Sequence, residues 1–427
     1  MQKNALSRIA FSLYRARVQS GPHWKESMIP MKSQQASFIW RAGMLLATLW
    51  IGLLSSLPLR AADAPESWLG LPVSYAERSY AFRPWPAIEL KSVRIMTSDA
   101  ITMNRAWVKP DWAQWIQGGN TNTIRVEADE IVARPAALAR LGLSDGKSTR
   151  RITHMRFERL KLLMGTRELN LPAGEMEFAA DGTLAHIRLS IEGVNFDATP
   201  NSGKLALLVQ MANWRWDALP ALRFENVVAQ GDLTDFGLSF HKIGGNADGG
   251  SLAGTLKLAV DANFVLDGDL TLISMRAADV LGRLRPGTTV SGGLNGAVKL
   301  TASGEQFADL GPSLAANGTY VINKGAIDRF GIASGMQRES AGPAGGGNTR
   351  FERLNGTFNG KTGQVASVTV QRLDSGPLQG SGNFVVMQDG VLKGGFAASM
   401  RLPSGATLSR SFALGGKVDS PQLSTRD

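Results

Sequence analysis

Apolar and polar residues alternate along most of the chain beyond residue 87, with the period of a β-strand that has one buried face. The alternation is clear at residues 124–129, where aliphatic and alanine positions are interleaved with arginine, glutamate and aspartate. It recurs at residues 187–191, 256–260, 368–370 and 384–386. The pattern predicts a protein that is mainly β, with roughly twenty strands.

Short polar segments rich in glycine, aspartate and asparagine separate these strands, as hairpins of an antiparallel sheet require. We expect turns at residues 180–182, 359–360 and 388–390, and helices of about two turns at residues 110–117 and 277–284. Residues 65–86 show no clear period and predict an irregular lead-in along the surface. With so few helices, the sheet must pack against another sheet or leave an apolar face for a ligand.

An N-terminal leader precedes this body. Residues 42–57 carry no charge, follow Lys32 and Arg41, and end at Pro58, which is typical of an export signal. Cleavage after Ala64 would make it a signal peptide, whereas retention would make it a helical membrane anchor; the sequence leaves both open. We divide this part into a basic leader, residues 1–36, whose start before Met31 is open to reassignment, and a hydrophobic segment, residues 37–64. The body is expected on the far side of the membrane.

Net charge argues against nucleic-acid binding. The formal charge is +10, but residues 1–60 hold eight basic residues and one acid, which leaves +3 for the rest of the chain. A nearly neutral body lacks the clustered lysine and arginine that bind phosphate backbones. Cysteine is absent, so the chain has neither disulfides nor thiolate metal ligands.

The residue patterns of common catalytic sites are missing from the sequence. Its four histidines are not spaced as metal ligands on one helix face, and no Gly-x-Ser-x-Gly motif with partners is visible. Residues 356–362 resemble a phosphate-binding loop but have three residues between the outer glycines where four are needed. We therefore expect no metal, no cofactor and no enzymatic activity.

The C-terminal part carries ordered motifs. ISMRAADVL (273–281) is followed by VSGGLNG (290–296), GGGNTRF (345–351), LNGTF (354–358), LQGSGNF (378–384) and LGGKVDSP (414–421). In this order they resemble the C-terminal region of the AsmA family, and residues 82–141 look like an N-terminal segment of that family.

The resemblance implies a Gram-negative envelope protein, usually tethered to the inner membrane and with a periplasmic body. It implies an elongated, curved, largely antiparallel β-sheet that forms an apolar groove, and a role in phospholipid movement and outer-membrane biogenesis. We accordingly divide the body into an N-terminal β-rich region, residues 65–230, and an AsmA-like groove region, residues 231–427.

The leading hypothesis is a lipid-binding or lipid-transfer module with phospholipid and the inner membrane as partners. A scaffold for outer-membrane or secretion proteins is the alternative, in which sheet edges bind other envelope proteins. Under the first hypothesis, alternate strand residues line the groove. The candidates are Ile124, Val126, Ile187, Leu189, Ile191, Leu256, Leu258, Val260, Val368 and Val370.

Overall fold

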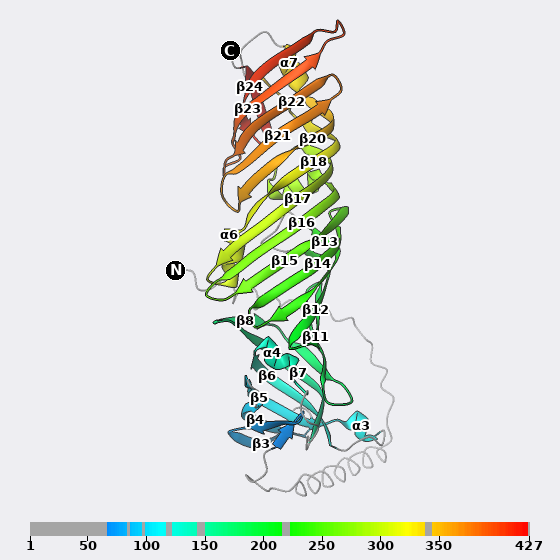
Figure 1. The fold of residues 1–427 in the computed structure, drawn as a ribbon, viewed down its shortest axis with the longest axis vertical. Helices are drawn as coiled ribbons and strands as arrows, with labels where there is room; N and C mark the ends of the chain where they lie inside the picture. Colours follow the sequence, from blue (N-terminus) through cyan, green and yellow to red (C-terminus); the bar gives the residue numbers. More distant parts are fainter. Residues whose placement is uncertain are drawn as a thin grey trace, which may run out of the picture. The chain divides into compact units, whose positions relative to one another are not determined.

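The computed structural model describes residues 66–82, 86–95, 99–116, 122–142, 150–215, 223–337 and 344–425 (Figure 1). The predicted leader and the hydrophobic segment at residues 37–64 lie outside these ranges. In the part of the chain that the structure describes, no helix has the length and hydrophobicity needed to cross a membrane.

The described residues form one 25-stranded sheet with a few short helices, which confirms a mainly β fold. The first half contains β1 (Glu66–Trp68), β2 (Leu71–Ser74), β3 (Glu77–Phe82), β4 (Pro86–Ile95), β5 (Ile101–Pro110), α3 (Trp112–Ile116), β6 (Thr123–Ala133), α4 (Pro135–Ala139), β7 (Arg151–Met164), β8 (Arg167–Leu171), β9 (Gly174–Phe178), β10 (Leu184–Ile191), β11 (Val194–Asn201), β12 (Lys204–Arg215) and β13 (Arg223–Thr234).

The second half continues with β14 (Gly237–Ala247), β15 (Gly250–Val260), β16 (Phe264–Arg276), α5 (Ala277–Leu284), β17 (Val290–Gly304), the 3-10 turn η1 (Phe307–Asp309), α6 (Leu310–Ser313), β18 (Ala315–Asp328), α7 (Ile332–Gln337), β19 (Ala344–Gly345), β20 (Asn348–Lys361), β21 (Ala366–Ser375), β22 (Leu378–Val386), β23 (Leu392–Arg401), β24 (Thr407–Lys417) and β25 (Ser420–Thr425). The predicted helix at 277–284 is confirmed as α5, and the first predicted helix is present in the shorter form α3.

Strand order follows chain order almost throughout. From β9 to β18, and from β20 to β25, each strand pairs antiparallel with the next. Pairs that skip one or more strands are β2–β4, β7–β9, β18–β20 and β19–β25. Among the named strands that the structure describes, the parallel pair is β6–β7, whose connection includes α4. Parallel neighbours need a crossover segment, because both strands start at the same end. The sheet is continuous through β13, inside which the division at residue 230 falls.

Two of the sequence predictions are wrong. Residues 65–86 contain three short strands, and Trp68 on β1 is fully buried. The turn predicted at Asn359–Gly360 lies inside β20, and the chain turns directly after it, where the Gln364 amide donates to the Lys361 carbonyl at 3.0 Å. Gly360 is needed as a small strand residue, because a Cβ there would lie 3.1 Å from the Ala366 methyl group.

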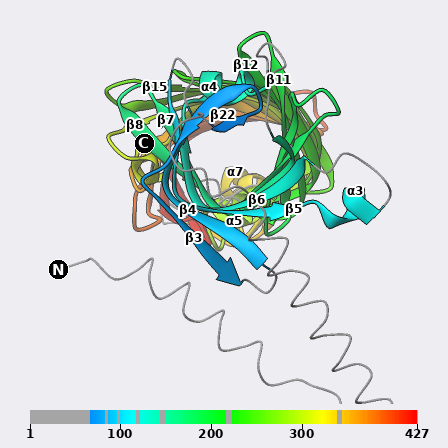
Figure 2. The ribbon, with the colours of Figure 1, turned by 90° about the horizontal axis from the view of Figure 1, so that it is seen from below.

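One face of the sheet, which we call the inner face, is apolar from β4 to β25. The register places Val126 beside Met155, and the same face continues through Ile187 and across the later strands. Figure 2 shows these strands wrapping around the line of view. Most of their buried inner-face side chains form one large hydrophobic cluster, which we call the main cluster. The sheet therefore buries its apolar side largely against itself.

Glycine recurs on the inner face opposite large side chains. Gly380 is paired with Ala398 on β23, and a Cβ at Gly380 would meet the ring of Phe396 too closely. Phe396 is 5% exposed and makes an edge contact with Phe330, with ring centroids 6.3 Å apart. The aromatic ring thus occupies the volume that the missing side chain leaves.

We expect Gly380→Ala to lower the free energy of unfolding by about 1–3 kcal/mol, because it overpacks this site. The cost should be smaller in a Phe396→Leu background, where the ring is gone. Gly415→Ala is the matched control, since a Cβ at that strand glycine has no atom within 4 Å. Urea denaturation of the four variants and the wild type measures the coupling, and an equal cost in both backgrounds would contradict the packing argument.

Short helices cover parts of the inner face. Helix α4 contacts β7, β11, β12 and β13, and its Leu138 is fully buried. The amide of Ala136 in its first turn donates to the Asp235 carboxylate at 2.9 Å, which satisfies a free helix donor. Helices α5 and α6 contact β16 and β17, and α7 contacts β20 and β23 to β25. These helices therefore cover the inner face over the middle strands and over the C-terminal strands of the sheet.

A buried carboxylate joins α3 to the sheet. Asp111 is 1% exposed, accepts a hydrogen bond from the Thr153 hydroxyl at 2.7 Å, and has the Arg125 Nε 3.2 Å from its other oxygen. Burial alone would raise the pKa of Asp111, but the Thr153 hydrogen bond and the Arg125 charge outweigh it, so the pKa lies below its ordinary value. The ionised form therefore stabilises the fold.

Asp111→Asn should lower the free energy of unfolding by about 1–3 kcal/mol at neutral pH. Because the pKa is lowered in the folded state, the stabilisation by Asp111 is present above the ordinary carboxyl pKa of about 3.9 and is lost as the pH falls through the folded value. Urea titrations between pH 7 and pH 3 should show the difference between wild type and variant shrinking with acidity. A difference that stays constant would count against the assignment.

Candidate functional site: the apolar inner face

All ten residues proposed from the sequence as groove-lining lie on the inner face. The register connects them through β6, β10, β15 and β21, with Ile187 opposite Met176 and Val368 opposite Phe384 as two of the links. Period-two alternation fixes the face within each strand, and antiparallel pairing carries that face to the next strand. The structure thus brings the ten side chains onto one continuous surface.

Their exposure divides them into two groups. Seven are nearly covered: Ile124 (4%), Val126 (1%), Ile187 (3%), Leu189 (9%), Leu258 (5%), Val260 (0%) and Val370 (7%). Leu256 and Val368 are half-buried, and Ile191 is 41% exposed. The covered side chains offer little surface to a ligand, whereas the other three remain accessible at their present positions.

A second cluster on the same face, which we call the rim cluster, adjoins Ile191. Its buried members are Val194, Val209 and Ala229, with the partly buried Phe196, Met211, Trp214, Phe240 and Ile243 packed around them. Ile191 is paired with Val194 across β10 and β11. Sequence reasoning missed these residues, although the alternation of Val194, Phe196 and Ala198 is the signal that could have revealed them.

Hairpin turns form two long rims of the sheet. Rim A carries the β7–β8, β10–β11, β12–β13, β14–β15 and β16–β17 connections, and rim B carries those of β11–β12, β13–β14, β15–β16, β22–β23 and β24–β25. Turns alternate between the rims because successive strands run in opposite directions. The contacts between the two rims show where the sheet closes over its inner face.

An N-terminal clasp joins the β7–β8 turn to two turns of rim B. The Gly165 amide donates to the Asp235 carbonyl at 2.7 Å, and the Thr166 hydroxyl donates to the Asp261 carbonyl at 3.0 Å. The Arg167 Nε donates to the Ala262 carbonyl at 2.9 Å. Backbone carbonyls at hairpin ends are free acceptors, so these bonds need no acidic partner.

A C-terminal clasp joins the segments after α5 and β18 to rim B. The Arg285 guanidinium donates to the carbonyls of Met387 and Gln388 in the β22–β23 turn. The Arg329 guanidinium donates to the Asp419 carbonyl at 3.1 Å in the β24–β25 turn. Both clasps therefore connect turns that are several strands apart in the sheet.

Between the clasps lies an unclasped segment of rim A. It comprises the ends of the strands β10 to β15 that lie on rim A, from Ile191 at the end of β10 to Gly250 at the start of β15. Among the described residues, no hydrogen bond or ion pair connects it to rim B. The rim cluster lies along this segment. On rim B, Phe307 in η1 is 47% exposed and Val365 in the β20–β21 connection is 44% exposed. Accessible apolar side chains of the inner face therefore lie along a part of rim A for which the described residues show no bond to rim B.

The Tyr320 hydroxyl on the inner face has a hydrogen-bond partner within the protein. The Tyr320 hydroxyl donates to the Thr369 carbonyl at 3.2 Å, and burial raises the pKa of Tyr320 above its ordinary value. The phenol therefore stays neutral and contributes a largely apolar ring to the face.

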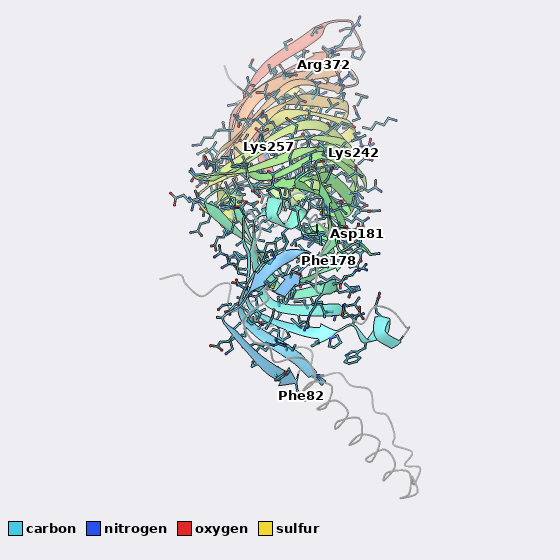
Figure 3. All side chains as sticks on the ribbon, turned by 60° about the horizontal axis from the view of Figure 1, so that its bottom comes forward. Phe82, Phe178, Asp181, Lys242, Lys257 and Arg372 are labelled. Atoms are coloured by element: carbon cyan, nitrogen blue, oxygen red, sulfur yellow. The ribbon has the colours of Figure 1, made fainter. Side chains whose placement is uncertain are left out.

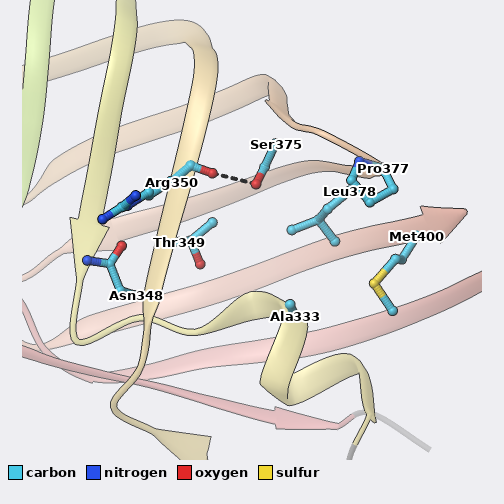
Figure 4. A pocket seen from close by; sticks show the side chains of 8 residues that line it. All are labelled: Ala333, Asn348, Thr349, Arg350, Ser375, Pro377, Leu378 and Met400. Carbon is cyan, nitrogen blue, oxygen red and sulfur yellow. Dashed lines mark hydrogen bonds between the residues drawn. The ribbon is translucent and has the colours of Figure 1, made fainter. Parts of the chain in front are cut away.

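A pocket of about 410 Å³ lies between α7 and the C-terminal strands, where Leu378 and Met400 of the inner face line it (Figure 4). Ala333, Leu378 and Met400 form its apolar side, and Arg350 is the charged residue of its lining. The Ser375 hydroxyl, which faces the pocket, donates to the Arg350 carbonyl. The lining contains neither a carboxylate nor an imidazole that could act as a base for Ser375.

The opposite, outer face carries paired charges. Arg105 and Asp129, Lys109 and Glu127, Arg188 and Glu177, and Lys204 and Asp232 form ion pairs at 2.7–3.1 Å between neighbouring strands. These pairs are partly exposed and keep charged groups on this face in contact with water. Lys242 and Lys257 lie exposed on it (Figure 3). No group of three or more potential metal ligands is found within the described ranges.

The comparisons with known proteins give no relative: no protein-family model matches the sequence, and neither a curated protein nor a solved structure shows significant similarity to it. The class of protein that the structure defines is a mainly β protein built on one large, mostly antiparallel sheet with a single apolar face.

Proposed function

We propose that this protein is a non-enzymatic lipid-binding or lipid-transfer module of the bacterial envelope, in which the inner face forms an apolar groove for acyl chains. The proposal follows the AsmA-like order of the C-terminal motifs. It places the body in the periplasm, tethered to the inner membrane by residues 42–57 or released by cleavage near Ala64. Outer-membrane biogenesis is the process that it would serve.

The observation that carries the proposal is the unclasped segment with its half-exposed apolar side chains. Ile191, Phe196 and Met211 offer adjacent hydrocarbon surface beside a rim whose described residues make no bond to the opposite rim. Each methylene that leaves water contributes about 0.8 kcal/mol, so six methylenes of an acyl chain contribute roughly 5 kcal/mol. Binding of this kind requires no catalytic residue.

Native mass spectrometry of the full-length chain, purified from a bacterium that expresses it, tests the proposal. We expect phospholipid masses bound to the protein, and uptake of fluorescent phosphatidylglycerol from vesicles after the lipid has been removed. A folded chain that carries no lipid and takes none from vesicles would overturn it. Protease treatment of spheroplasts and intact cells tests the periplasmic location separately.

An edge strand supports the scaffold alternative. Strand β3 pairs only with β4 among the described strands, and its Tyr80 and Phe82 are 51% and 78% exposed. A free edge with exposed aromatics can accept a strand from another protein. Ser79→Pro and Tyr80→Pro are made as separate variants. Successive amides of a strand point to opposite edges, so only one of the two variants removes an amide that points away from β4. Loss of a co-purifying envelope protein in one variant only, with lipid binding retained, would favour this function.

A further inference from the structure

Two arginines face each other across the end of β12 and β13, on the unclasped segment of rim A. Arg215 is the register partner of Arg223, and both side chains are exposed. Like charges directly opposite each other on neighbouring strands destabilise a sheet. Such a pair needs an anion or a high dielectric to offset the repulsion.

Neither guanidinium is neutralised within the described part of the chain. The acids of the adjacent β14–β15 turn and of β13 have other partners. The Asp248 carboxylate is buried, accepts the Arg223 backbone amide at 3.2 Å and forms an ion pair with Arg283. The Glu225 carboxylate accepts the Gly249 amide at 3.0 Å. The arginine pair is thus left with two positive charges at the rim.

Aromatic side chains connect this pair to the rim cluster. Trp214 stacks on Phe224 with ring centroids 5.6 Å apart and an angle of 25° between the planes. Trp214 is half-buried and packs against the rim cluster. The positive φ of 51° at Asn213 belongs to a local irregularity that brings Trp214 back to the inner face after Met211. Arg215 and Arg223 therefore lie on the outer face of the two strand ends whose inner face carries Trp214 and Phe224.

We propose that Arg215 and Arg223 bind the phosphate of a phospholipid whose acyl chain lies on the rim cluster. Guanidinium groups donate paired hydrogen bonds to phosphate oxygens, and two of them can reach both non-bridging oxygens, which share the negative charge of a phosphodiester. Their long side chains can reach over the rim while the charged ends stay in water. This inference rests on the proposed function and adds the ligand class and the place of its headgroup.

Binding of two ligands to the full-length protein in mild detergent tests this inference. The ligands are phosphatidylglycerol and a diacylglycerol with the same two chains, which lacks the phosphate. The test variant is Arg215→Gln/Arg223→Gln, and the matched control is Lys242→Gln/Lys257→Gln, which removes two exposed positive charges from the outer face. Inorganic phosphate alone serves as a third probe.

We expect the arginine variant to lose about tenfold or more in affinity for phosphatidylglycerol, with diacylglycerol binding unchanged and the lysine control equal to wild type. An unchanged affinity for phosphatidylglycerol would overturn the headgroup site and leave lipid binding intact. An equal loss for diacylglycerol would show that the arginines act through the fold. If wild type binds inorganic phosphate as tightly as phosphatidylglycerol, and the arginine variant loses this binding, then the ligand of the arginine pair is free phosphate and not a phospholipid. If wild type binds no lipid at all, the proposed function itself fails.

Discussion

Replacing Ile191 by glutamate should lower the affinity for phospholipid at least about tenfold, which corresponds to about 1.4 kcal/mol. Ile191 is the most exposed of the ten inner-face candidates and borders the rim cluster. A carboxylate there would have to lose water when an acyl chain covers it, and this cost opposes binding. Because Ile191 is already 41% exposed, the free protein can keep the new charge hydrated and remain folded.

Ile273→Glu is the matched control for this experiment. Ile273 is 47% exposed and paired with Ser251, which places it on the outer face. The same substitution at similar exposure should leave lipid binding and stability unchanged. Equal losses in the two variants would show that added charge, not the inner face, governs binding. Titration of each purified variant with fluorescent phosphatidylglycerol supplies the comparison.

Leu138→Ala should lower the free energy of unfolding by about 2–5 kcal/mol, because the substitution leaves a cavity beneath α4. Leu138 is fully buried, and its helix covers β11 to β13 beside the rim cluster. Helix α4 has only five residues, so packing and the Asp235 cap hold it in place, not helix propensity. Urea denaturation followed by tryptophan fluorescence measures the effect.

Leu284→Ala in α5 provides the comparison for α4. Leu284 is 57% exposed, so its truncation should change the free energy of unfolding by less than about 0.5 kcal/mol. If the two leucines cost the same, α4 does not hold the place in the core that the structure gives it. If Leu138→Ala leaves stability high but increases lipid uptake, α4 acts as a removable cover of the inner face.

Local sequence patterns predict much of this fold. The alternation at residues 124–129 and 187–191 predicts strands where the structure has β6 and β10. The helix predicted at residues 277–284 is α5, with the same bounds. The turn at 359–360 fails because glycine also serves as a small residue within curved strands, and no local signal separates these two uses. The groove, the leader and the lipid remain predictions.

The sequence by itself determined which side of each strand is apolar, because successive strand residues point to opposite faces whatever the rest of the chain does. It therefore selected ten side chains on the apolar sides of their strands, and the strand register of the structure joins these sides into one surface. Only the tertiary structure decided which of them are covered. The position of α4 and the two clasps depend on contacts between residues about one hundred positions apart, such as Ala136 with Asp235 and Arg285 with Met387. The parallel β6–β7 pair joins residues that are closer in sequence, such as Val126 and Met155, but it too depends on a connection that leaves the sheet. Such contacts have no local pattern, and they leave Ile191 accessible while Val126 is buried.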